Sequence, residues 1–251
     1  IGDYYNTAMD TLKRAAEGIA PIQDLLDKVR GLQSTTQLPA LLADFHKIGI
    51  GSVFGFYVYQ DLKKNDTHIS YVSQGGLGLP DRDYYFNDDS NSKELRATYA
   101  THMDGLMTLA GLGSEYSKTV IAIETDLAEV SMNRTQRRDS EAQYNKRTVS
   151  QLQEMAPSFG WGSYLSEIGV KIDTIIVSQP DFFAGLEKTL NKYSIEDWKK
   201  YLNWNILNST ASELSPELEA KDFEFYGTAL SGAKKMKPTW ERTLKQINRG
   251  M

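Results

Sequence analysis

The stretch SQGGLGLPDRDYYF, residues 73–86, decides how this chain is interpreted. It holds three glycines within four residues, then Leu-Pro, then Asp-Arg-Asp and two tyrosines. Taken alone, it fits a phosphate-binding loop, a metal-binding loop or a structural turn. The residue types that each kind of site needs, and the sequence on either side, separate these three interpretations.

A phosphate-binding role is poorly supported. A dinucleotide-binding loop has the pattern Gly-x-Gly-x-x-Gly between a strand and a helix. Gly76 and Gly78 match the first two glycines, but Asp81 occupies the third position and Pro80 prevents immediate entry into a helix. A structural turn explains these residues better, because glycine tolerates positive φ and proline fixes the turn that follows.

The composition is that of an ordinary globular protein and argues against several classes. Of 251 residues, 40% are hydrophobic and 24% charged, with a formal net charge of −5. This acidic balance disfavours nucleic acid as a partner, since phosphate binding needs clustered Lys and Arg. The longest apolar runs span a few residues, far short of the roughly 18 that cross a bilayer, so we expect no membrane segment. The chain contains no cysteine, which excludes disulfides, thiolate ligands and a cysteine nucleophile.

The hydrophobic pattern predicts a mainly α fold with a small β-hairpin element. Apolar residues recur at helical spacing over residues 1–48, with Gly and Pro at the stops. Residues 52–60 and 67–74 are β-branched and aromatic, and the polar segment between them is typical of a hairpin loop. Beyond the hairpin the chain returns to helices and no linker divides it. We therefore expect a single helical domain over residues 1–251.

Local signals also predict several element boundaries. Ser114, after a glycine, is a candidate N-cap for a helix that reaches about Arg134. Thr148 begins a capping-box pattern, residues 173–179 predict a short strand, and Ser194 opens a long helix.

The histidines do not form a recognised metal motif. His46, His68 and His102 have no ligand-like spacing, and no cysteine is present to complete a zinc site. We interpret each as an ordinary packed or surface histidine.

Two groups of carboxylates have structural explanations as well. Asp88, Asp89 and Glu94 resemble calcium ligands, but the glycine of the sharp turn is missing and the last Glu is misplaced, so helix capping explains them better. A second acidic run is more typical of a solvated helix face than of a paired-carboxylate active site. It consists of Glu213, Glu217, Glu219, Asp222 and Glu224. We assign no catalytic, cofactor-binding or metal-ligating residue to this chain.

The opening stretch also matches a family signature. Gln74 and the residues from Leu77 to Tyr85 follow the order Gln-x-x-Leu-Gly-Leu-Pro-x-Arg-Asp-Tyr-Tyr. In this respect the chain resembles the neprilysin and endothelin-converting-enzyme family of zinc metallopeptidases, and a bacterial member of it in particular. Further matches occur in family order over essentially the whole chain. They are Gly18 with Pro21, Glu124 with Leu127 and Ala128, Arg138 with Asp139, Tyr144 to Lys146, Tyr201 to Trp204, Phe225 with Tyr226, and Trp240 to Arg242.

The catalytic motifs of that family are not found in this sequence. His-Glu-x-x-His, whose histidines bind zinc and whose Glu acts as general base, lies C-terminal to the matched region in the family. The chain starts at Ile1 without an initiator Met and stops at Met251 inside an expected helix. We therefore interpret it as a piece of a longer protein, its N-terminal non-catalytic (cap) lobe.

The resemblance implies a partner and a function for this lobe. In the family, a mostly helical lobe faces the catalytic zinc lobe of the same polypeptide across a cavity and restricts entry to peptides and small polypeptides. The zinc of the parent enzyme would be bound by the absent catalytic lobe, and this chain alone should be inactive. Hinge motion between the lobes would gate entry. The lack of cysteine departs from the animal members and favours a bacterial parent, in the periplasm or at the cell surface, with the cytoplasm also possible.

Two other interpretations stay open. One is a stand-alone helical binding or scaffold protein that shares the lobe but not the enzyme. A reading frame that stops at Met251, instead of continuing into His-Glu-x-x-His, would favour it. The other is an unrelated hydrolase that uses the acidic run near Glu217.

Within the opening stretch we expect a turn that leads the hairpin back to the helical body. Arg82 and Asp83 should satisfy local backbone groups or each other. The apolar side chains of the turn should be buried, and these are Leu77, Leu79, Tyr84 and Tyr85.

Overall fold

The computed structural model describes residues 2–250, which are mainly helical with one four-stranded sheet. The predicted fold class, mainly α with a small β element, is confirmed. The helices are α1 (Gly2–Met9), α2 (Thr11–Glu17), α3 (Gln23–Arg30), α4 (Leu38–Lys47), α5 (Asp83–Phe86), α6 (Ser90–Leu109), α7 (Ser117–Glu129), α8 (Val149–Met155), α9 (Trp161–Glu167), α10 (Pro180–Lys192), α11 (Ile195–Thr210), α12 (Pro216–Asp222) and α13 (Thr239–Gly250). The strands are β1 (Phe54–Asp61), β2 (Lys64–Gln74), β3 (Lys146–Thr148) and β4 (Thr174–Val177). A π-helical turn, Phe223–Ala229, follows α12.

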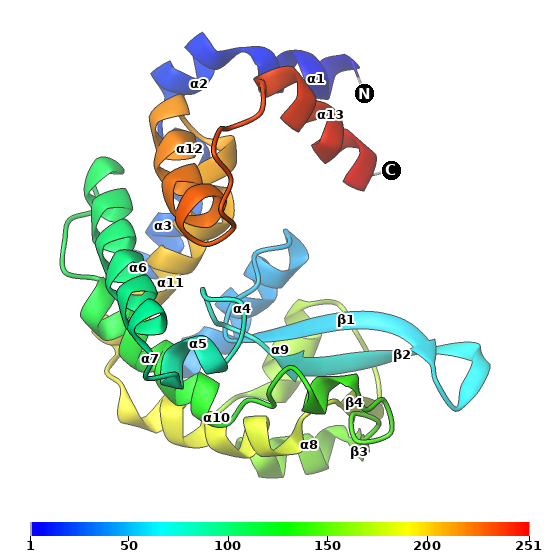
Figure 1. The fold of residues 1–251 in the computed structure, drawn as a ribbon. Helices are drawn as coiled ribbons and strands as arrows, with labels where there is room; N and C mark the ends of the chain where they lie inside the picture. The colour runs from blue at the N-terminus through cyan, green and yellow to red at the C-terminus, as the bar shows by residue number, and fades with distance from the viewer. Residues whose placement is uncertain (1, 251) are drawn as a thin grey trace.

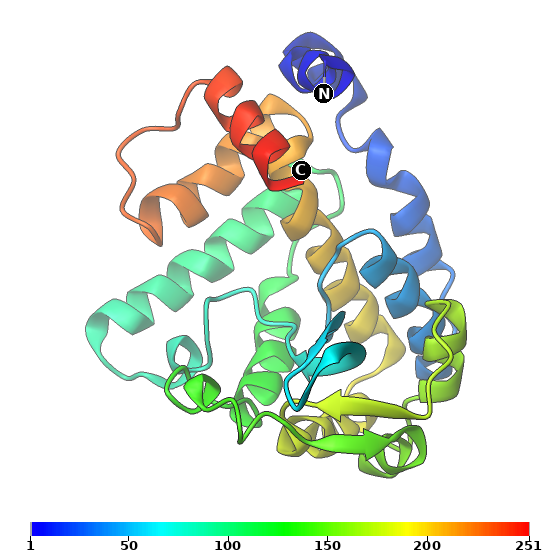
Figure 2. The ribbon, with the colours of Figure 1, turned by 90° about the vertical axis from the view of Figure 1, so that its right-hand side faces the viewer.

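The helices form a curved body with an arm at each end. In Figure 1, α1, α2 and α13 lie at one end, and the β1–β2 hairpin projects from the other. Both arms extend to the same side of the body that contains α3, α6, α7 and α11. Figure 2, turned by 90°, shows the hairpin and α13 both directed toward the viewer. The two arms therefore border a concave side of the molecule.

The predicted hairpin is confirmed and belongs to a larger sheet than we expected. Strands β1 and β2 pair antiparallel, with Phe54 opposite Gln74 and Gln60 opposite His68. The strand predicted over residues 173–179 is β4, which adds parallel to β2, and β3 pairs antiparallel with β4. No local sequence signal indicated that the hairpin extends into this sheet, because β3 is only three residues long and parallel pairing joins segments far apart in the chain.

Both boundaries of one helix, predicted from Ser114 to about Arg134, were wrong. The helix expected from Ser114 is α7, which begins only at Ser117 and ends at Glu129. Its N-terminus is capped from α6, because the carboxylate of Asp104 accepts hydrogen bonds from the backbone N–H of Tyr116 (2.8 Å) and of Ser117 (2.9 Å). Such a cap satisfies the unpaired N–H groups of a first turn without leaving a signal beside the helix.

The other predicted caps are confirmed. Thr148 and Ser194 each form a capping box at the start of α8 and α11. Asp89 caps α6 by accepting a hydrogen bond from the backbone N–H of Ser92 at 3.0 Å. The capping role is therefore confirmed for Asp89, whereas Asp88 forms an ion pair with Lys93 (3.3 Å) and Glu94 lies within α6.

An aromatic cluster fixes the root of the hairpin to the helical body. Phe54, at the start of β1, has its ring centroid 5.1 Å from Trp161 and 5.2 Å from Tyr164 of α9. It also lies 6.0 Å from Phe183 of α10. All four side chains are buried, and burial of such a side chain stabilises a fold by roughly 1.5–3 kcal/mol. The hairpin therefore projects from a rigid base.

Candidate functional site

The turn that follows β2 is held at both ends by the C-terminal half of α7 and its extension. The side-chain amide of Gln74 donates to the carbonyl of Met132 (3.0 Å), and its oxygen accepts from the Met132 N–H (2.8 Å). At the other end of the turn, Arg82 Nε donates to the carbonyl of Ala128 (3.1 Å). Arg82 thus satisfies a backbone group, but one that is distant in the sequence. Its ion pair with the neighbouring Asp83 is weak, with 3.8 Å between the Arg82 nitrogen and the Asp83 oxygen.

Two glycines let the turn pass very close to aromatic side chains. Gly76 has φ +78, and a Cβ on it would lie 2.4 Å from the hydroxyl of Tyr201. A Cβ on Gly78 would lie 1.9 Å from the hydroxyl of Tyr99. Tyr201 also donates a hydrogen bond to the Gly76 carbonyl at 2.8 Å. These glycines serve close packing, so the interpretation of the stretch as a structural turn is confirmed.

A buried carboxyl lies directly beneath the turn. Glu124 of α7 is 1% exposed. Its Oε1 accepts hydrogen bonds from the Gly78 N–H (3.2 Å) and the Tyr99 hydroxyl (3.0 Å), and its Oε2 accepts from the Tyr85 hydroxyl (2.8 Å). Burial raises the pKa of Glu124 to about 8, against the opposing effect of these hydrogen bonds. Sequence reasoning noted Glu124 only as a family match, and no local signal identified its environment.

The apolar side chains of the turn are buried to different degrees. Leu79 and Tyr85 are buried as expected, whereas Leu77 and Tyr84 are only half-buried. Tyr85 is oriented by its hydroxyl, which accepts from the Leu79 N–H at 3.1 Å as well as donating to the buried carboxyl. The tyrosines of the signature therefore contribute both apolar area and hydrogen bonds.

A cavity of about 240 Å³ opens beside the turn, between the root of β1 and α11. Its walls include Ser52, Gly75, Gly76, Trp204, Asn205 and Asn208. Hydroxyl, amide and backbone groups of this kind can hydrogen-bond water or a peptide group. Glu124 is the one ionisable residue among its lining residues, so the cavity has no acid–base pair.

The three histidines are not brought together. The Nδ1 atom of His46 lies 2.6 Å from the hydroxyl of Tyr164, and His68 is exposed on β2. His102 is 4% exposed and stacks on Phe225 with ring centroids 5.0 Å apart. Its burial lowers its pKa to about 4. Within residues 2–250, no group of three or more metal-ligating side chains is placed to hold an ion, so these residues do not fit a zinc site.

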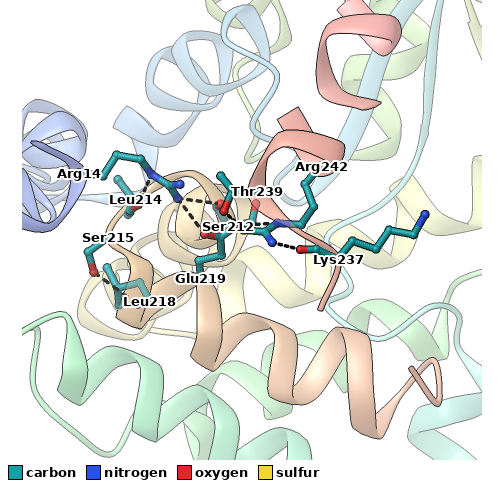
Figure 3. A network of polar contacts seen from close by, with 9 residues as sticks. All are labelled: Arg14, Ser212, Leu214, Ser215, Leu218, Glu219, Lys237, Thr239 and Arg242. Carbon is teal, nitrogen blue, oxygen red and sulfur yellow. Dashed lines mark hydrogen bonds and ion pairs between the residues drawn. The ribbon is translucent and has the colours of Figure 1, made fainter. Parts of the chain in front are cut away.

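The acidic run contains a carboxylate shared by two arginines, from α2 and α13, as Figure 3 shows. Glu219 Oε2 lies 3.3 Å from Arg14 Nη2, and Glu219 Oε1 lies 2.6 Å from Arg242 Nη2. Arg14 also donates to the carbonyls of Leu214 (2.8 Å) and Ser212 (3.2 Å). The network therefore ties α2 and α13 to α12 and the segment before it, and it borders a cavity of about 330 Å³.

The remaining carboxylates of that run do not form a paired site. Glu224 lies 2.8 Å from Lys221 in an exposed ion pair, and Glu217 is exposed. Burial, with a smaller effect of Glu219, raises the pKa of Asp222 to about 6. Since the central carboxylate is neutralised by two guanidinium groups, this arrangement offers no support for a hydrolase that uses the acidic run.

No helix within residues 2–250 is both long enough and apolar enough to cross a bilayer.

Comparison with known proteins gives a consistent family. The model of peptidase family M13, for its N-terminal part, matches residues 1–251. Endothelin-converting enzyme 1 of Bos taurus is 26% identical over an aligned length of 257 residues, gaps included. The alignment covers 95% of this chain and 34% of that protein. The chain thus spans about a third of the length of the curated relatives that it matches.

Two solved structures resemble the fold over nearly its full length. Zinc metalloprotease Zmp1 of Mycobacterium tuberculosis, in complex with an inhibitor, has a TM-score of 0.93 and 30% identity, covering 99% of this chain and 39% of that one. PepO of Lactobacillus rhamnosis has a TM-score of 0.83 at 17% identity, covering 98% of this chain and 40% of that one, and supports the fold alone. The resemblance stated from the sequence is confirmed, and the chain belongs to peptidase family M13, as the N-terminal region of a zinc metallopeptidase family.

Proposed function

We propose that this chain is the non-catalytic lobe of a longer zinc metalloendopeptidase and that it controls which peptides reach the zinc. The observation that carries the proposal is the match of the family model for the N-terminal part over residues 1–251. The matched relatives are named as a converting enzyme and a zinc metalloprotease, and about three fifths or more of their length lies outside the matched region. The peptide-cleaving chemistry and its zinc then belong to the part of the polypeptide that this chain does not include.

The shape of the lobe supports a role in controlling which substrates enter the space in front of the catalytic lobe. Its two arms border a concave side, with α13 at one end and the hairpin at the other. A second lobe facing that side would enclose a space that unfolded peptides enter and folded proteins do not. Zmp1 structures described as an open state and a partial open state match this chain with TM-scores of 0.92 and 0.81. A parent that opens and closes in the same way would admit substrate and release product by movement between lobes.

The packing of the signature turn supports a rigid wall rather than a moving loop. The turn is hydrogen-bonded at one end to Met132, just beyond α7, through Gln74, and at the other end to α7 through Arg82. Its centre is fixed by Glu124 and Tyr201. A wall held in this way moves as one body, so gating would arise at the junction with the catalytic lobe.

Residues 1–251 would form one domain of that parent, paired with its catalytic lobe, with peptides as substrates. The proposed location of the parent is the bacterial periplasm or cell surface. A reading frame that ends at Met251 would instead favour the stand-alone scaffold.

The test uses the longer polypeptide and three substrates of related sequence. These are a peptide of ten residues, a small folded domain that contains the same ten residues, and that domain unfolded by substitution of its core. We expect cleavage of the peptide and of the unfolded domain, and at least tenfold slower cleavage of the folded domain. Equal rates on the folded and unfolded domains would contradict a size-excluding lobe. A folded domain with the ten residues in a long exposed loop serves as the control for sequence accessibility.

A further inference from the structure

The outer edge of β1 is open. β1 stands first in the strand order β1-β2-β4-β3, and among residues 2–250 its only strand partner is β2, apart from one isolated bridge between Ser52 and Phe54 at its first residue. An edge strand presents a row of backbone N–H and C=O groups that have no strand partner. In Figures 1 and 2, β1 is the strand nearest to α13, so its outer edge borders the concave side.

β1 lacks the features that normally protect a sheet edge. Natural edge strands are short, or carry lysine, other charges or proline. The segment from Phe54 to Gln60 pairs in regular register and contains no charged residue and no proline, and the register shifts only between Gln60 and Asp61. At the opposite edge, β3 is only three residues long and carries Lys146 and Arg147. The sheet is therefore protected at one edge and left available at the other.

The side chains of β1 form an exposed aromatic surface along the same strand. Tyr57 and Tyr59, two residues apart on one face of the strand, are 45% and 58% exposed, and Val58 on the opposite face is 55% exposed. The ring of Tyr57 stacks on that of Tyr71 of β2, with centroids 5.1 Å apart and planes 4° apart. Tyr57 is thus held in position before any partner binds. Cross-strand contacts between aromatic and apolar side chains on one face stabilise a strand pair.

We propose that the outer edge of β1 binds an extended peptide segment as an additional strand, on the concave side of the lobe, an inference that rests on the proposed function. Beyond Phe54, which bridges to Ser52, the regular register from Gly55 to Gln60 spans roughly 20 Å at about 3.4 Å per residue. Backbone pairing recognises an extended chain of almost any sequence, whereas alternate side chains give the preference. Apolar or aromatic residues at alternate positions of the peptide would contact Tyr57 and Tyr59.

A peptide fits this edge better than a charged partner does. The edge carries no charge that would attract a charged partner. Its backbone N–H and C=O groups are spaced to form hydrogen bonds with another extended backbone. The edge also lies where the proposed function brings unfolded peptides. Docking there would hold a segment of substrate while another segment reaches the catalytic lobe.

The test measures binding of a fluorescent ten-residue peptide, with Leu and Phe at alternate positions, to the 251-residue chain. Two copies of the peptide carry N-methyl groups on either the odd or the even residues. A strand pairs through the amides of one of its edges only, so we expect one copy to bind at least tenfold more weakly and the other to bind within about threefold of the parent peptide. Amide hydrogen exchange should slow in residues 54–61 and not in residues 146–148. Absence of binding, equal affinity of both copies, or protection elsewhere would each overturn the proposal.

Variants on the exposed surface give an independent check without disturbing the core. Tyr59→Lys adds a protective charge to the edge and should weaken peptide binding at least fivefold. Leu109→Lys, at a 50% exposed position of α6, is the matched control and should leave binding unchanged. Association of the chain with itself that Tyr59→Lys abolishes, without binding of the peptide, would assign the edge to a second copy and reject the proposal. If the chain binds the peptide as expected but the longer polypeptide cleaves folded and unfolded substrates at equal rates, the proposed function is rejected and the peptide-binding edge is not.

Discussion

Gly78 and Tyr99 are packed so closely that no side chain fits between them, since a Cβ on Gly78 would lie 1.9 Å from the Tyr99 hydroxyl. The same hydroxyl donates to Glu124 (3.0 Å) and accepts from the indole N–H of Trp204 (3.1 Å). The signature turn, α6, α7 and α11 therefore meet at one point. The Leu-Gly-Leu-Pro signature is at this position a packing requirement rather than a ligand-binding loop.

Replacement of Gly78 by alanine should destabilise the lobe by at least about 2 kcal/mol, because the new methyl group displaces Tyr99 and its hydrogen bonds. The measurement is urea unfolding followed by tryptophan fluorescence. Gly162→Ala is the matched control, since a Cβ there meets no atom within 4 Å and α9 should gain up to about 1 kcal/mol from alanine. Equal midpoints for the two variants would contradict the packing argument.

The buried Glu124 predicts a decline in stability at higher pH. Its folded-state pKa of about 8 lies above the ordinary value of about 4.3. Between these values the folded protein keeps a proton that the unfolded chain releases. The stabilisation is therefore complete below the ordinary pKa and is lost as pH rises to about 8, by up to about 1.4 kcal/mol per pH unit. Glu124→Gln removes the titration, so the stability of the wild type relative to this variant should fall from pH 5 to pH 8. Parallel stability curves would show that Glu124 is not neutral in the folded state.

His102 predicts the opposite dependence on the acid side. Burial, with a further contribution from Lys221 and against the effect of Glu224, lowers its pKa to about 4. Since the unfolded chain takes up the proton near pH 6.5, the stabilisation is complete above that pH and is lost as pH falls to about 4.

The test for His102 is substitution by phenylalanine, which keeps a ring in the stack with Phe225. His102→Phe should lose less stability than the wild type between pH 6.5 and pH 4, measured by urea unfolding at each pH. His68→Phe, at an exposed position on β2, should retain the acid loss of the wild type. An acid loss in His102→Phe equal to that of the wild type would exclude this histidine as its source.

Because Glu219 pairs with both Arg14 and Arg242, we expect its substitution to destabilise α2 and α13 together. Glu219→Gln removes the charge that Arg14 and Arg242 share, at a site where all three side chains are largely buried. We expect a loss of about 1–3 kcal/mol and faster amide exchange in α2 and α13. Glu224→Gln, which affects only an exposed pair with Lys221, should cost no more than about 0.5 kcal/mol. Faster exchange in only one of the two helices would mean that Glu219 does not join them.

Local sequence signals predicted the features that depend on neighbours in the chain. The capping box at Thr148, the helix start at Ser194, the β1–β2 hairpin and the glycine-containing turn each follow from a few consecutive residues. These signals arise from backbone preferences and short-range hydrogen bonds, so they need no knowledge of the rest of the fold.

The features that sequence reasoning missed all depend on distant contacts. The Asp104 cap of α7 and the two-arginine environment of Glu219 join residues that no periodicity connects. Glu124 sits in a helix at a position where a carboxylate would ordinarily be solvated, and only the tertiary structure shows the tyrosine hydroxyls around it. The open edge of β1 likewise became visible only when the strand order was known.

The most direct test of the central claim is peptide hydrolysis by the 251-residue chain, with total zinc counted in the same sample. If the chain is a lobe whose chemistry lies elsewhere in the polypeptide, it should cleave no peptide and hold far less than one zinc per molecule, while the longer polypeptide cleaves the same peptide in a chelator-sensitive manner. Chelator-sensitive hydrolysis by the chain alone, with stoichiometric zinc, would contradict the assignment and place a catalytic site within these residues.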